Sequence, residues 1–128
     1  MQIYFETEFI TISYNKASHS SIVKWNLPPM SEEYRKGLNA LLLCMKHFKT
    51  GKVVADLTNF GTLHPDDQEW SSTEWTEKAM ELGYSDIAII LSSDVYSQMA
   101  IEDTMSPVTN TLNVAYFDNI EKAVEWIK

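Results

Sequence analysis

Three short apolar runs in this sequence alternate with segments that have helical periodicity. The runs read KVVADL from residue 52, DIAIIL from residue 86 and LNVAYF from residue 112. Runs of this length, rich in β-branched residues, are typical of strands that are buried on both faces. Because strands that alternate with helices generally pair in one direction, we expect a mostly parallel sheet with helices packed on it.

The first part of the chain has a different pattern, in which apolar and polar residues alternate. This alternation runs through FITISYN from residue 9 and SIVKWNL from residue 21, with the turn NKASHS between them. A period of two is typical of half-buried strands, and the turn predicts a hairpin. An earlier short strand places Ile3 and Phe5 on one face. The expected order is βββαβαβαβα, an α/β sandwich with an antiparallel hairpin at one edge, and residues 1–128 form a single domain.

Apolar spacing and end signals predict four helices, over residues 31–51, 65–83, 94–105 and 118–128. Ser31 is the expected N-cap of the first helix, and Gly51 is its expected C-terminal cap. Asp118 and Glu121 have the spacing of a capping box at the start of the last helix.

Charge is distributed unevenly along the chain. The net charge is −8 at pH 7, and residues 53–121 hold thirteen acidic residues and one basic residue, Lys78. A surface this acidic repels phosphate backbones, so nucleic acid is not an expected partner. No apolar run approaches the roughly 20 residues that span a bilayer, so no membrane span is expected. The single cysteine, Cys44, is expected to be a small core residue, which fits a reducing cytoplasm.

Asp56 lies at the carboxyl end of the KVVAD strand, where α/β proteins often place ligands and catalytic acids. A phosphoacceptor aspartate would need an acidic pair after the first strand and a lysine after the last one. The last strand instead ends in YFDN. We therefore interpret Asp56 as a structural residue that accepts hydrogen bonds from the turn TNFG, which contains Thr58 and Asn59.

The remaining reactive residue types do not form a coherent catalytic set. The four glycines fall in neither a P-loop nor a dinucleotide-binding pattern. Ser92 and Ser93 lack a nucleophile elbow and are interpreted as a helix cap. A third hypothesis is a metal-assisted hydrolase with its metal bound by His64, Asp66 and Asp67. The alternative is that the two acids stabilise the helix dipole from the first helical turn. We expect no catalytic residue, no metal and no cofactor, because zinc usually takes three or four protein ligands.

Trp70 and Leu43 are the candidate interface residues. Trp70 lies nearly opposite the apolar face of its helix, among acidic residues, so its indole either folds over the preceding loop, which we favour, or contacts a partner. Leu43 points away from the apolar stripe of the first helix. If either residue lies in a two-fold patch, the protein forms a homodimer.

Two stretches resemble the STAS-like fold, and more specifically its small bacterial branch described as SpoIIAA-like. VVADLTNF is similar to the strand that ends in Asp-Leu-Ser before the regulatory loop of anti-sigma-factor antagonists. VAYFDNIEKAVEWI is similar to their last strand and last helix. The resemblance implies a non-catalytic switch domain that binds a protein partner through the loop with Asp56, Thr58, Asn59, His64, Asp66 and Asp67.

The same resemblance implies two further expectations. Antagonists carry a phosphorylated serine within Asp-Ser-Ser-Gly, whereas this chain reads HPDDQEW, so the acceptor serine is missing. Some relatives of this fold class bind lipids or other apolar ligands, which makes a small-molecule-binding domain the alternative. An apolar cavity beneath the helix over residues 65–82 would favour that alternative.

Overall fold

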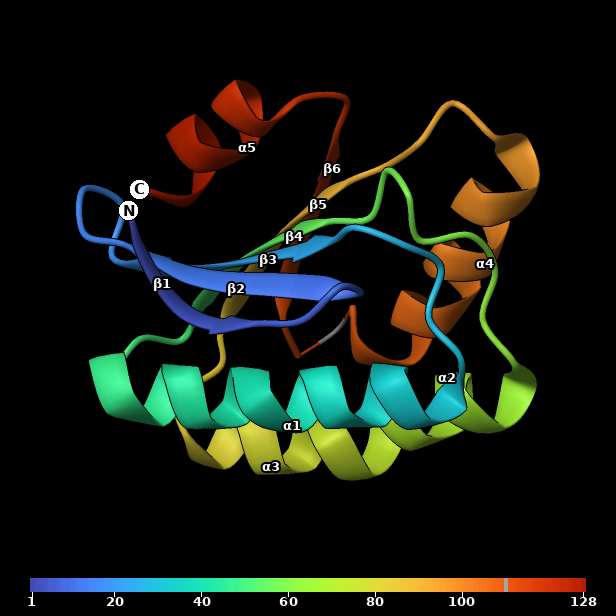
Figure 1. Cartoon of the computed structure of the whole chain (residues 1–128), viewed down its shortest axis with the longest axis horizontal. Coiled ribbons are helices and arrows are strands. Elements are labelled where there is room, and N and C mark those ends of the chain that lie inside the picture. Colours follow the sequence, from blue (N-terminus) through green and yellow to red (C-terminus); the bar gives the residue numbers. More distant parts are fainter. Residues whose placement is uncertain (110) are drawn as a thin grey trace.

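Six strands form one sheet in the computed structural model, which describes residues 1–109 and 111–128 of the chain (Figure 1). Their order across the sheet follows the sequence, with antiparallel pairing among the first three and parallel pairing from the third to the sixth. This confirms the expected α/β sheet with an antiparallel N-terminal edge. The strands are β1 (Gln2–Glu6), β2 (Ile10–Asn15), β3 (Ser20–Trp25), β4 (Lys52–Asp56), β5 (Asp86–Ile90) and β6 (Asn113–Phe117).

The helices cover the two faces of this sheet unequally (Figure 1). Crossovers between parallel strands are right-handed, so successive crossovers that advance in one direction place their helices on the same face. The helices before β6 therefore share one face, and the last helix packs on the other. They are α1 (Ser31–Phe48), α2 (Pro65–Trp70), the π-helix η1 (Ser71–Trp75), α3 (Thr76–Glu81), α4 (Val95–Met105), the 3₁₀-helix η2 (Ser106–Val108) and α5 (Ile120–Ile127).

Alternate residues of the central strands supply two cores. The larger core lies between the sheet and helices α1, α3 and α4, and contains Trp25, Met45 and Trp75. The smaller core lies under α5, where Val54 and Ala88 meet its apolar side. The larger core contains the candidate site.

The ends of α1 differ from those expected. Its N-cap is Met30, whose backbone N–H donates to the Glu33 carboxylate at 3.2 Å, and Ser31 is the first helical residue. At the other end Lys49 has the left-handed conformation, with φ 54°, and caps the helix in place of Gly51. Gly51 is needed for close packing instead, because a Cβ there would lie 1.8 Å from the Gly83 carbonyl oxygen.

The start of α5 and the register of β1 also correct expectations. Asn119 caps α5 by accepting a hydrogen bond from the backbone N–H of Lys122 at 2.9 Å, so Asp118 is not the cap. In β1 a bulge between Ile3 and Phe5 interrupts the alternation of faces. Phe5 packs on the larger core while Ile3 is exposed, so the prediction that they share one face was wrong.

Candidate functional site

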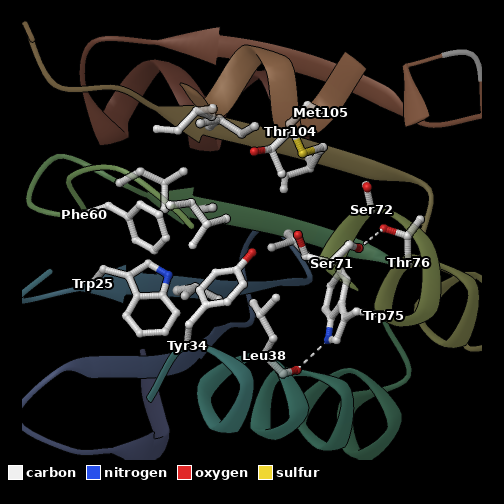
Figure 2. Close-up of a pocket in the computed structure, with 18 of the residues that line it drawn as sticks. Trp25, Tyr34, Leu38, Phe60, Ser71, Ser72, Trp75, Thr76, Thr104 and Met105 are labelled. Carbon is white, nitrogen blue, oxygen red and sulfur yellow. Dashed lines mark hydrogen bonds between the residues drawn. The ribbon is translucent and has the colours of Figure 1, made fainter. Parts of the chain in front are cut away.

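An apolar cavity of about 100 Å³ lies in the larger core, between the sheet and the helical stretch from α2 to α3 (Figure 2). Trp25 and Ile89 of the sheet, Leu38 of α1, Trp75 of η1 and Met105 of α4 contribute to its wall. None of the described residues that line it is charged. Most of the lining is carbon, so the cavity suits an apolar occupant.

A π-helix forms the part of the wall opposite the sheet. The sequence predicted one regular helix over residues 65–83, but η1 separates α2 from α3 within it. The backbone N–H of Thr76 donates to the Ser71 carbonyl, five residues earlier, and the Thr76 hydroxyl donates to the same carbonyl at 2.6 Å. Such segments are rare and are frequently found at functional sites. The run SSTEWT, rich in poor helix formers, was the available sequence signal.

An indole hydrogen bond fastens η1 to α1. The Nε1–H of Trp75 donates to the backbone carbonyl of Leu38 at 2.7 Å, and both residues line the cavity (Figure 2). The Trp75 ring also packs edge-on against Tyr84, with 5.5 Å between centroids. The wall on this side is therefore held by a specific tertiary contact as well as by apolar packing.

Two phenols are buried at the cavity. The Tyr34 hydroxyl points into the pocket (Figure 2). The hydroxyl of Ser71, which also lines the cavity, donates to the Gln68 carbonyl at 3.0 Å. Burial raises the pKa of Tyr34 to about 12, against the opposing effect of Ser71. Burial also raises the pKa of Tyr84. Both phenols are therefore neutral at physiological pH.

Asp56 makes the turn hydrogen bonds that the sequence predicted. Its Oδ1 accepts hydrogen bonds from the backbone N–H of Thr58 at 3.1 Å and from the Thr58 hydroxyl at 2.6 Å. These bonds form the Asx-type turn that leaves β4. Asp56 thus shapes the beginning of the loop that closes one side of the cavity.

The residues of this loop, 57–63, alternate between the cavity and solvent. Leu57, Phe60 and Leu63 line the cavity, whereas Thr58 and Asn59 are exposed. Gly61 also lines it with φ 81°, a left-handed conformation that favours glycine. One short loop therefore contacts both the cavity and the outer surface.

His64, Asp66 and Asp67 are separated by their environments. His64 is the N-cap of α2, and its Nδ1 accepts from the backbone N–H of Asp66 at 3.1 Å. Asp67 is buried, and its Oδ1 accepts from Arg35 Nε at 2.9 Å and from the Ser31 hydroxyl at 2.7 Å. Within residues 1–109 and 111–128, no group of three or more His, Cys, Asp or Glu is placed to hold a metal ion.

The two candidate interface residues also have different environments. Trp70 is half-buried, with its ring edge-on to Tyr34 at 6.3 Å and the Arg35 guanidinium 4.9 Å from its centroid. We expected the indole to fold over the preceding loop, and the ring contacts found are with α1. Leu43 is 59% exposed on α1.

None of the candidate residues predicted from sequence is among the described residues that line the cavity. The prediction located the loop but selected its exposed polar residues, whereas the apolar residues between them face inward. The cavity residues were counted as ordinary core, because an apolar residue beside a void has the same sequence pattern as one beside another side chain.

The fold and its elements define the class of protein. Antiparallel strands at the N-terminal edge, parallel strands covered by helices on one face and a final helix on the other face are the features of a STAS-like domain. A sequence model of the SpoIIAA-like family matches residues 22–128, so the chain belongs to the SpoIIAA-like family. No curated protein and no solved structure matches it. In the part of the chain that the structure describes, no helix combines the length and apolar character needed to cross a membrane.

Proposed function

We propose that this protein is a non-catalytic STAS-type regulatory module that binds a small apolar molecule in the cavity beneath α2, η1 and α3. The observation that carries the proposal is the cavity itself, which is uncharged and lined in part by a π-helix. An unfilled cavity of about 100 Å³ costs roughly 2 kcal/mol at about 24 cal/mol per Å³. A larger apolar cavity, of about 150 Å³, in another protein stays dry and binds benzene.

The loop over residues 57–63 connects the cavity to the outer surface of the protein. Phe60 lines the cavity, and its backbone N–H closes a turn on the Leu57 carbonyl at 3.1 Å, while Thr58 and Asn59 of that turn face solvent. A ligand that contacts Phe60 changes which loop conformations are favoured, and hence the surface offered to a partner. In this proposal cavity occupancy replaces the phosphoserine switch.

Protein binding at this loop is the second candidate function. It is favoured by the exposure of Thr58, Asn59, His64 and Asp66 on one connected segment, the one that the family resemblance assigns to regulation. Asp67 would support this surface from within by fixing α2 to α1. Metal-assisted hydrolysis is a weaker hypothesis, because the Asp67 carboxylate already accepts hydrogen bonds from Arg35 and Ser31.

The proposed setting is the cytoplasm. Cys44 is the single cysteine and is completely buried, with its Sγ 3.5 Å from the Ser21 hydroxyl. A lone buried thiol needs no oxidising compartment, and a reducing one keeps it unmodified.

Toluene binding tests the proposal. Protein-observed NMR titration of the wild type with toluene is expected to give saturable shifts at Phe60 and Ser71. Ala100→Leu adds bulk at the cavity wall from α4 and is expected to weaken binding at least tenfold. The matched control is Met99→Leu, because Met99 is exposed on the same helix and should leave binding unchanged. Absence of saturable binding to the folded wild type would reject a cavity ligand.

A further inference from the structure

The cavity wall has hydrogen-bonding groups but no charge. Its described polar side chains are those of Trp25, Tyr34, Ser71, Ser72, Trp75, Thr76, Tyr84 and Thr104. A carboxylate or ammonium group placed there would lose its hydration without gaining an opposite charge, which is strongly unfavourable. An occupant of this cavity is therefore uncharged.

The backbone accepts most of the side-chain protons of this wall. The Trp75 N–H donates to the Leu38 carbonyl at 2.7 Å. Four hydroxyl groups also donate to backbone carbonyls, at distances from 2.6 to 3.3 Å, and they belong to Ser71, Ser72, Thr76 and Thr104. Three protons of the wall have no backbone acceptor among the described residues, and they belong to Trp25, Tyr34 and Tyr84.

Trp25 decides the polarity of the occupant, because an indole N–H can only donate. A phenol both donates and accepts, so Tyr34 and Tyr84 suit an occupant of either kind. Every fully enclosed side-chain nitrogen or oxygen of the described residues has a hydrogen-bond partner. The Trp25 N–H has no partner among these residues, so its nitrogen borders open space.

The open space beside the Trp25 nitrogen is the cavity. Trp25 is only 2% exposed, and it lines the cavity. Figure 2 shows the nitrogen on the side of the indole that is turned toward Tyr34 and the other lining residues. The N–H of Trp25 is therefore a donor directed at the occupant.

Close neighbours hold the Trp25 indole in this orientation. Its benzo edge packs on Gly37, where a Cβ would lie 2.7 Å from Cη2. The ring stacks on Tyr34 with 5.8 Å between centroids and meets Phe60 edge-on at 5.5 Å. A buried donor without a partner is unfavourable, so an occupant that brings an acceptor to this fixed N–H gains affinity.

We infer that the ligand is a small, uncharged carbonyl compound whose oxygen accepts a hydrogen bond from the Trp25 Nε1–H. This inference rests on the proposed function, because it concerns the same cavity. A carbonyl group supplies the missing acceptor and adds no proton to a wall that already has protons without a backbone acceptor. The volume of about 100 Å³ is smaller than that of the cavity of about 150 Å³ that holds benzene, so the apolar part is one small ring.

Two probes of nearly the same shape test the inference. Cyclopentanone has the carbonyl oxygen, and methylenecyclopentane has a CH₂ group in its place. Dissociation constants are measured by NMR titration, and the value for the ketone is divided by the value for the alkene within each variant. These ratios are compared between variants, because the hydration of each probe is common to all of them.

The indole proton resonances report the hydrogen bond directly. Cyclopentanone should move the Trp25 indole N–H resonance downfield, and methylenecyclopentane should not. The resonance is assigned by its loss in Trp25→Phe. The Trp75 indole N–H is the internal control, because it already donates to Leu38.

Two changes at Trp25 remove the donor. In Trp25→Phe, cyclopentanone should lose about tenfold in affinity relative to methylenecyclopentane, the worth of one hydrogen bond. Benzothienylalanine at the same position has a sulfur in place of the N–H and keeps the shape of the indole, so it should give the same loss. It decides the question if Trp25→Phe does not fold. A purely structural role of Trp25 would change both probes together.

Three further variants accompany these changes, and urea denaturation confirms that each is folded. Trp126→Phe is the matched control, because it removes an exposed indole on α5 and should keep the wild-type ratio. Tyr34→Phe and Tyr84→Phe remove the competing donors of the wall. A selective loss of cyclopentanone binding in either of them, and not in Trp25→Phe, would make a phenol the donor and overturn the inference.

The remaining outcomes separate the two proposals. If the wild type binds neither toluene nor the two cyclopentane probes, the proposed function fails, and the inference fails with it. If these neutral probes bind but both Trp25 changes leave the ratio unaltered, the cavity function stands and the inference is overturned. Saturable binding of cyclopentanecarboxylate in the cavity would also overturn it, because the ligand would then be charged.

Discussion

The Nε atom of Arg35 lies 2.9 Å from Oδ1 of Asp67, which joins α1 to the first turns of α2. The Asp67 side chain is 4% exposed and that of Arg35 is 40% exposed. The same carboxylate oxygen accepts from Ser31, and the guanidinium stacks over Trp70. Asp67 therefore holds in place the helix that leads into η1, which lines the cavity.

Asp67→Ala is expected to lower the free energy of unfolding by about 1–3 kcal/mol, because it removes a buried acceptor and leaves its donors unpaired. Urea denaturation measures the loss. Asp66→Ala is the matched control, since Asp66 is exposed next to Asp67 and contributes only through the helix dipole and an exposed contact with His64, at most about 1 kcal/mol. Equal losses for the two variants would show that the buried carboxylate has no special role.

Alkaline pH is expected to destabilise the protein through Tyr34. Burial raises its pKa to about 12 in the folded state, from about 10 in the unfolded chain. Between these values the folded state retains a proton that the unfolded state releases, so stability is complete below pH 10 and falls as the pH rises toward 12. The loss attributable to Tyr34 is on the order of 2 kcal/mol at pH 12.

Urea denaturation at pH 9 and pH 11.5 checks this pH dependence in wild type and Tyr34→Phe. The variant should lose less stability than the wild type over the same interval, and Tyr84 accounts for part of what remains, since its pKa is raised too. Identical slopes in the two proteins would contradict a raised pKa at Tyr34.

Cys44 is expected to be unreactive in the native state. The side chain is fully buried, and burial raises the pKa of its thiol, which lowers the fraction of reactive thiolate. A thiol reagent such as a dithiobisbenzoate should modify wild type slowly in buffer and rapidly in urea. As a control, the double variant Asn39→Cys, Cys44→Ala moves the thiol to an exposed site on α1 and should react rapidly in both. Rapid modification of the native wild type would contradict the prediction.

The homodimer remains a prediction, and Leu43 is now a better candidate interface residue than Trp70. Leu43 is exposed on α1, whereas the Trp70 indole is engaged by Tyr34 and Arg35. Sedimentation equilibrium is expected to give a dimer for the wild type, a monomer for Leu43→Glu and a dimer for Trp70→Ala. A monomeric wild type would reject self-association, and a dimeric Leu43→Glu would remove Leu43 from the interface.

The sequence determined the features that depend on residues close together in the chain. Local side-chain patterns specify the α/β class. They are the alternation of apolar and polar residues in β2 and β3, the apolar runs of β4 to β6 and the helical spacing between the strands. The Asp56 turn and the His64 cap were predictable for the same reason. Each is a side chain bonded to a backbone N–H two residues away.

The tertiary structure alone decided the cavity and the environments of the residues around it. Asp67 and Asp66 are adjacent acids with the same sequence signal, yet only Asp67 meets Arg35, 32 residues earlier. Trp75 and Leu38 meet across 37 residues, and the cavity lies where such distant segments fail to fill the space between them. A void is a property of packing among several elements, and no local pattern of residues records it.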